Sequence, residues 1–131
     1  MPRKPSRTLT DGEARIMEVI WDLGRATVRD VSDRLAAEEE VAYNTVQTMM
    51  AILERKGALR RRREGRAHVY EPLLTRSQAR SQALQHVLGR FFASSPHVLL
   101  QSLLAEEQVD AAQIEKMRRL LDEAPEEGDD T

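Results

Sequence analysis

Residues 42–57, AYNTVQTMMAILERKG, combine an apolar stripe with an uncharged polar stripe. The apolar residues recur at the three- and four-residue spacing of a helix, at Val46, Met49, Met50 and Leu53. The opposite stripe carries short amide and hydroxyl side chains, at Asn44, Thr45, Gln47 and Thr48. A solvated helix face more often carries Glu, Lys and Arg. We therefore expect this face to meet something other than bulk water.

Amide and hydroxyl side chains on an exposed helix are suited to reading DNA. In the major groove, Asn and Gln pair with adenine, and Thr contacts the thymine methyl group. Long charged side chains would instead add affinity that does not depend on sequence. For the helix alone, a modestly polar surface is an equally good interpretation, so the neighbouring segments decide between the two.

Five arginines follow this helix within seven residues, at Arg60, Arg61, Arg62, Arg63 and Arg66. Two strand-like segments, 58–63 and 66–71, flank Glu64-Gly65, and Pro72 closes the second, which predicts a hairpin. Because side chains alternate between the faces of a strand, we expect two or three of these arginines to contact phosphate. The alternative is a solvated hairpin whose charges protect an edge.

Two helices before residue 42 are expected to pack against the polar-faced helix and the hairpin. Thr10-Asp-Gly-Glu13 has the form of a capping box, so a helix should begin after Thr10 and end near Gly24. Its inner face is marked by Ile16, Met17, Val19, Ile20 and Leu23, and Trp21 is expected to pack in or beside the core. Thr27-Val-Arg-Asp30 offers a second cap. Three helices followed by a basic hairpin predict a mainly α fold, the winged helix-turn-helix.

Residues 76–123 should form further helices that are too small for a core of their own. We expect their apolar stripes to build a homodimer, which would present two recognition helices to a palindromic site. Packing back onto the same chain is the alternative. The residues expected at the dimer interface are Leu84, Val87, Leu88, Phe91, Phe92, Leu99, Leu100, Leu103, Leu104, Ile114, Met117, Leu120 and Leu121.

The composition narrows the classes of function. The chain has 131 residues, and its hydrophobic content of 40% is enough for a core. We expect a flexible basic arm (1–8), a winged domain (9–75), a helical dimerisation region (76–123) and a disordered acidic tail (124–131). Residues 1–75 hold 14 basic and 12 acidic side chains, a net charge of +2, and the remainder has 6 and 10, giving −4. There is no cysteine, no apolar run of membrane-spanning length and no apolar leader, which favours a cytoplasmic protein that does not contact membrane.

Enzymatic chemistry has little support in the sequence. The three histidines, at 68, 86 and 97, lack the paired spacing of metal ligands, and no phosphate-binding loop or nucleophile motif is present. We therefore expect neither a metal nor a cofactor.

The segments LTDGEARIMEVIWDLG, TVRDVSDRL, AYNTVQTMMAILERKG and RAHVYEPLLTRSQA, in this order, resemble the penicillinase-repressor family (BlaI, MecI and CopY). The resemblance runs from about Leu9 to Leu121. It implies a homodimeric repressor that binds inverted-repeat operators on double-stranded DNA. By position in the matched helix and wing, it implies that Tyr43, Asn44, Thr45, Gln47 and Thr48 read the operator and that Arg63 and Arg66 flank the wing tip.

Two family features differ in this chain. β-Lactam-responsive members are cleaved at an Asn-Phe bond by a sensor protease, and the corresponding pair here is Ser102-Leu103. Copper-responsive members carry a cysteine cluster, which this chain lacks. The sequence therefore leaves the inducing signal open. Two other functions stay open as well, namely a protein-interaction module with a leucine-rich groove and a small-molecule sensor.

Overall fold

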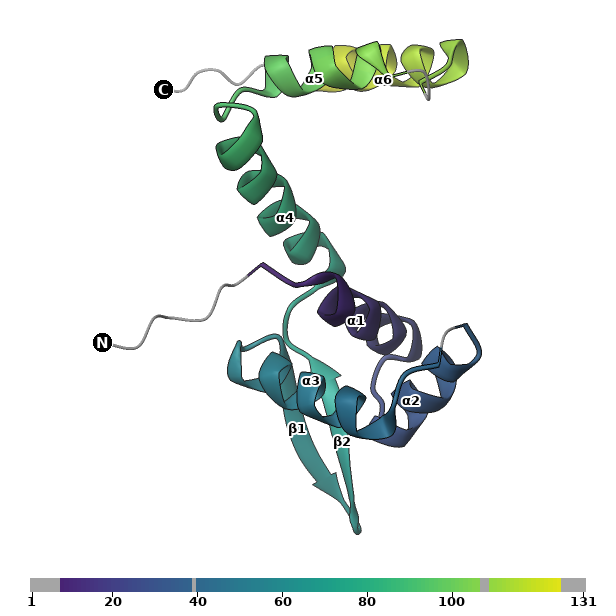
Figure 1. Ribbon diagram of the computed structural model, residues 1–131. Coiled ribbons are helices and arrows are strands. Elements are labelled where there is room, and N and C mark those ends of the chain that lie inside the picture. Colours follow the sequence, from purple (N-terminus) through teal and green to yellow (C-terminus); the bar gives the residue numbers. More distant parts are fainter. Residues whose placement is uncertain (1–7, 39, 107–108, 126–131) are drawn as a thin grey trace, which may run out of the picture. The chain divides into compact units, whose positions relative to one another are not determined.

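A computed structural model describes residues 8–38, 40–106 and 109–125. The chain forms two compact units, residues 1–87 and 88–131. The first begins with helices α1 (Asp11–Leu23), α2 (Val28–Ala36) and α3 (Tyr43–Arg55), then strands β1 (Leu59–Glu64) and β2 (Ala67–Pro72), as Figure 1 shows. The later helices are α4 (Arg76–Phe91), α5 (Pro96–Ala105) and α6 (Ala111–Glu123). The predicted arm and acidic tail lie outside the described residues, apart from Thr8, Ala124 and Pro125.

Local signals set the ends of the first two helices. Both predicted capping boxes are present, Thr10 with Glu13 and Thr27 with Asp30, so the backbone amides at these helix starts are satisfied by side chains. α1 ends at Leu23, and its cap residue Gly24 has a φ of 86°, in the region that glycine occupies without strain.

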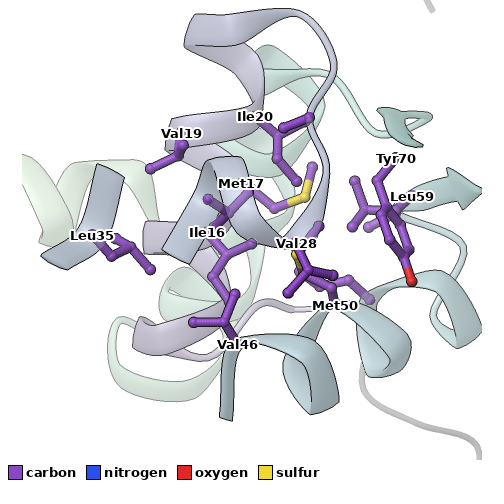
Figure 2. Close-up of a cluster of buried hydrophobic side chains, with 14 residues drawn as sticks. Ile16, Met17, Val19, Ile20, Val28, Leu35, Val46, Met50, Leu59 and Tyr70 are labelled. Atoms are coloured by element: carbon purple, nitrogen blue, oxygen red, sulfur yellow. The ribbon is translucent and has the colours of Figure 1, made fainter. Parts of the chain in front are cut away.

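One apolar cluster holds the three helices and the hairpin together (Figure 2). Ile16, Met17 and Ile20 of α1 meet Val46 and Met50 of α3, and all five are at most 1% exposed. Burying a side chain of this size contributes about 1.5–3 kcal/mol. The cluster therefore fixes which face of α3 turns outward.

Leu23 is a correction to the predicted core. It is 43% exposed and lies beside an open depression lined by Arg25, Asp30 and Arg34. Its helical spacing matches that of Ile16 and Ile20, but it is the last residue of α1 and is not part of the buried cluster.

The strands pair antiparallel, from Leu59 opposite Pro72 to Glu64 opposite Ala67. The turn is therefore Gly65-Arg66, one residue later than predicted, and the φ of Gly65 is 63°. Ala26, in the connection between α1 and α2, pairs with Tyr70 through two backbone hydrogen bonds of 2.8 and 3.0 Å. This bridge attaches the base of the hairpin, called the wing below, to the three-helix core.

The segment after the wing is anchored to α1. The indole of the half-buried Trp21 donates to the Leu74 carbonyl at 2.9 Å, as expected for a packed tryptophan. Arg76, at the start of α4, binds Glu18 at 2.7 Å and Asp22 at 3.2 Å. Its guanidinium carbon lies 5.3 Å from the centre of the Trp21 ring.

The second unit contains the end of α4 and two capped helices. The Ser95 hydroxyl accepts from the Val98 amide at the start of α5, where Pro96 occupies the first turn. Asp110 and Gln113 form a capping box at the start of α6. Neither helix contains a buried residue, so the apolar side chains of α5 and α6 are not fully covered in the isolated chain.

Candidate nucleic-acid interface

The outward face of α3 is polar and open, as predicted. Asn44, Thr45, Gln47 and Thr48 are all exposed, and Tyr43 at the start of the helix is 38% exposed. On the opposite face Val46, Met50 and Leu53 are completely buried. α3 is thus anchored along one side and presents the uncharged stripe on the other.

Two contacts with α1 hold α3 in place. At Gly12, an added Cβ would lie 2.5 Å from the Met49 methyl group, so a larger residue there would make the end of the Met49 side chain move. Lys56, just after α3, forms a 2.7 Å ion pair with Glu13 of α1, and the two side chains are 10% and 5% exposed. Burial raises the pKa of Glu13, but hydrogen bonds from Lys56 and from the Thr10 amide outweigh it and leave the pKa below its ordinary value.

The wing arginines separate into two sets. Arg60 and Arg62 lie two residues apart on one face of β1, and both bind Glu71, at 2.6 and 3.3 Å. Arg61 is directed to the other face, where its Nε lies 3.8 Å from Glu54 of α3. Arg63 donates to the Gly65 carbonyl at 3.2 Å. The expectation that the arginines would not share one face is confirmed.

α3, the wing and the start of α2 enclose a shallow concavity of about 360 Å³, which we call the α3–wing concavity. Its lining includes Tyr43 and Gln47 from α3, and Arg61, Arg66 and His68 from the wing. It thus brings together two of the predicted base-reading residues and two of the predicted phosphate-binding arginines. The remaining members of both predicted sets lie outside its lining.

Arg29 is a residue that the sequence reasoning missed. It lies in the first turn of α2, lines the α3–wing concavity, and its guanidinium carbon is 5.0 Å from the centre of the Tyr43 ring. Over the part of the chain that the structure describes, no carboxylate pairs with Arg29 or Arg66. The sequence did offer a signal for Arg29, because this basic residue lies between the apolar Val28 and Val31 in the capped segment TVRDV, where it is exposed.

The wing tip carries one further ion pair, between Glu64 and Arg25, 2.5 Å apart. Arg25 lies in the connection that also pairs with β2. The wing is therefore attached to the helical core at its base and again near its tip.

The predicted dimerisation residues differ in burial. Leu88 is 7% exposed, while Phe92, Leu99, Leu100, Ile114 and Met117 are half-buried. The others are exposed, namely Leu84, Val87, Phe91, Leu103, Leu104, Leu120 and Leu121. Ser102 and Leu103, the pair that corresponds to the family's cleavage site, are both exposed within α5.

Within residues 8–38, 40–106 and 109–125, no group of three or more His, Cys, Asp or Glu residues is arranged to hold a metal ion. None of the helices in these ranges combines the length and hydropathy that crossing a membrane requires.

Comparison with known proteins gives consistent matches. A family model described as "Penicillinase repressor" matches residues 9–123. The chain is 30% identical to the transcriptional regulator BlaI of Mycobacterium tuberculosis, over 88% of this chain and 83% of that protein. It is 28% identical to the penicillinase repressor of Bacillus licheniformis, over 88% and 90%.

A solved structure supports the fold. The solution structure of the DNA-binding domain of the repressor BlaI matches 60% of this chain and 93% of that domain, with 33% identity and a TM-score of 0.50. The predicted winged helix-turn-helix is therefore confirmed.

Proposed function

Since this chain belongs to the penicillinase repressor family of DNA-binding transcriptional repressors, we propose that it acts as a homodimer on an inverted-repeat operator. In this proposal the outward stripe of α3 reads bases in the major groove, and the wing contacts the backbone beside it. Such a repressor would work in the cytoplasm, where the chromosome lies.

One observation carries the assignment of faces. The uncharged stripe of α3 borders a concavity lined by guanidiniums, and two of these, Arg29 and Arg66, have no carboxylate partner among the described residues. A sugar–phosphate strand separates the two grooves of DNA. A protein that places a helix in one groove and a hairpin at the next must therefore hold a strand between them. The α3–wing concavity has the position and charge for that strand.

Base reading is proposed for Asn44, Thr45, Gln47 and Thr48, with Tyr43 at the helix start. Phosphate contact is proposed first for Arg29, Arg61 and Arg66, which line the concavity. Arg63 is proposed at the wing tip. Arg60 and Arg62 are placed last, because each already donates a hydrogen bond to Glu71, which partly neutralises its charge.

Homodimerisation is supported by the apolar side chains of the second unit. Phe91, Leu120 and Leu121 are each 65–70% exposed. Large apolar side chains this exposed, two of them adjacent in sequence, favour a protein interface. A two-fold dimer would cover these residues and would supply the second recognition helix that an inverted repeat requires.

A sensor protease is proposed as a partner on the resemblance alone. The Ser102–Leu103 bond lies within a regular helix, so a protease that binds extended chain would have to unwind α5 first. Cleavage there would separate α6 from the rest of the dimerisation surface.

The test of function is the selection of bound sites from a random duplex pool with the full chain. We expect enrichment of an inverted repeat whose half-sites lie about one helical turn, or a multiple of it, apart. Enrichment of a single unpaired motif would remove the dimer from the proposal. A pool that stays random would remove sequence-specific binding.

The faces are tested by replacing Gln47 or Thr48 with Ala. Each base contact contributes about 1–3 kcal/mol of discrimination, so affinity for the selected operator should fall about 5- to 150-fold, with little change on random duplex. Fluorescence anisotropy measures both affinities. The exposed Gln85 of α4 provides the matched control, because Gln85→Ala should bind like the parent protein.

A further inference from the structure

Glu71 lies where the hairpin joins the core and binds two arginines of the opposite strand. Its Oε1 accepts from Arg60 at 2.6 Å and its Oε2 accepts from Arg62 at 3.3 Å. The Glu71 side chain is 21% exposed, whereas those of Arg60 and Arg62 are 57% and 54% exposed. One carboxylate at the base of the wing therefore holds two guanidiniums that extend into solvent.

The register explains this arrangement. Arg60 is directly opposite Glu71, and Arg62 shares its face because it is two residues further along β1. Arg61, between them, lines the α3–wing concavity. The hydrogen bond from Arg60 lowers the pKa of Glu71 below its ordinary value, so the carboxylate is charged at neutral pH.

Exposed ion pairs contribute little to folding stability, so stability alone gives a weak reason for this pairing. Its consequence for DNA binding is of a different kind. Each phosphate contact adds affinity that carries no sequence information, and each makes binding more dependent on salt. A guanidinium that is bound to a carboxylate keeps other N–H donors, but its charge is partly neutralised and its position is restrained, so it binds phosphate less favourably.

We propose that Glu71 restrains Arg60 and Arg62 and thereby limits the sequence-independent component of DNA binding. This inference rests on the proposed function, since it concerns how the wing meets DNA. In this arrangement Glu71 is a specificity-determining residue that need not touch DNA. As a result, contacts to the DNA phosphates are made mainly by the arginines that line the α3–wing concavity.

The test is Glu71→Gln in the full chain, with affinity for random-sequence duplex measured by anisotropy across a range of salt concentrations. The neutral amide keeps one acceptor oxygen but removes the negative charge that holds both guanidiniums, so both are restrained less. We expect the plot of log affinity against log salt to steepen by up to about 2 units and the affinity near 0.1 M salt to rise about 3- to 30-fold. Circular dichroism and thermal melting confirm that each variant is folded.

Asp33→Asn supplies the control for charge. Asp33 is exposed on α2, and no arginine within the described ranges pairs with it. This variant removes the same negative charge without releasing a guanidinium, so it should change affinity and salt dependence much less. If Glu71→Gln behaves like Asp33→Asn, the inference is overturned.

A second set of variants separates release from other effects of Glu71. With Arg60 and Arg62 both replaced by Gln, adding Glu71→Gln should give no gain beyond that of Asp33→Asn. With Glu71 intact, the Arg60→Gln/Arg62→Gln pair should weaken binding less than Arg61→Gln/Arg66→Gln, although both remove two charges. Equal losses, or a gain that persists without the two arginines, would refute the restraint.

Failure of the proposed function gives a different result. A parent protein that binds no duplex overturns both proposals. A parent protein that binds DNA, with Glu71 variants that match their controls, overturns the restraint alone.

Discussion

Glu13 links two parts of the winged unit through a single carboxylate. It closes the capping box at the start of α1 and accepts from Lys56 just after α3. Both side chains of the ion pair are at least 90% buried, so each charge depends on the other for the interactions that water would otherwise supply. The orientation of α3 thus depends on a residue that has no contact with the proposed DNA surface.

We predict that Glu13→Gln lowers the free energy of unfolding by about 3 kcal/mol, because Lys56 loses its buried counter-charge. Urea denaturation at pH 7 measures the loss. Glu18→Gln is the matched control, since Glu18 pairs with Arg76 at an exposed position and its removal should cost far less. Equal losses for the two variants would show that the buried pair has no special weight.

The same pair predicts how stability depends on pH. The pKa of Glu13 is lower in the folded protein than its ordinary value of 4.5. The contribution of Glu13 to stability is therefore complete above pH 4.5 and is lost as the pH falls through the lower, folded-state pKa. Urea midpoints measured from pH 7 to pH 3 should decline less in Glu13→Gln than in the parent protein.

Arg29 gives a residue-scale test of the proposed strand position. Arg29→Gln should reduce the salt slope by about 0.9 on operator and random duplex alike, since a phosphate contact carries no sequence information. Arg34→Gln removes the same charge from the far end of α2, outside the concavity, and should leave the slope nearly unchanged. Indistinguishable slopes would exclude Arg29 from the strand-binding set.

The elements differ in how far local sequence defines them. α1 and α2 begin where capping boxes predict, because the cap residues and the amides they satisfy lie within four positions. The pairing of the wing arginines was less predictable. A shift of one residue in the strand register would exchange the faces of Arg60 and Arg61, and register depends on tertiary contacts such as the Ala26–Tyr70 bridge. The sequence therefore predicted the hairpin but not which arginines Glu71 would bind.

The start of α3 is unusual among the helices of the winged unit. Ala42 occupies the cap position and provides no side-chain hydrogen bond, whereas Thr10 and Thr27 cap α1 and α2. Amide groups at the start of α3 are therefore left without a side-chain acceptor, beside Tyr43 at the edge of the α3–wing concavity. A helix without a cap is less stable than a capped one. Substitutions at Ala42 therefore test whether the start of α3 is adapted to DNA binding at a cost in folding stability.

We predict that Ala42→Ser and Ala42→Asp each raise the free energy of unfolding by about 1 kcal/mol, because both side chains can cap the helix. Their effects on DNA should differ. The Asp variant adds a negative charge beside the proposed strand and should bind duplex more weakly at low salt, whereas the Ser variant should bind like the parent protein. Denaturation and anisotropy measure the two properties. Equal DNA affinities would contradict the proposed position of the strand.

At the scale of the whole molecule, the two units differ in what the sequence can determine. The apolar stripe of α3 has partners in the same unit, so its burial could be predicted from helical spacing alone. The apolar residues of α5 and α6 have the same spacing, yet none of them is buried in the isolated chain. Periodicity identifies an apolar face but not the surface that covers it. If a second copy of the chain covers α5 and α6, the pattern of a single sequence cannot show that contact.

The last prediction concerns that surface. Replacing Leu120 and Leu121 with Glu should convert a dimer into a monomer, because four charges would be buried across a two-fold interface. Sedimentation velocity measures the change, and Leu73→Glu is the control, since Leu73 is 53% exposed in the winged unit and outside the predicted interface. The monomer should keep its affinity for an isolated half-site. Its affinity for the full repeat should fall by about 10²- to 10⁴-fold, because the second half-site is no longer bound by a linked partner. A double variant that still sediments as a dimer would place the dimer contact elsewhere on the chain.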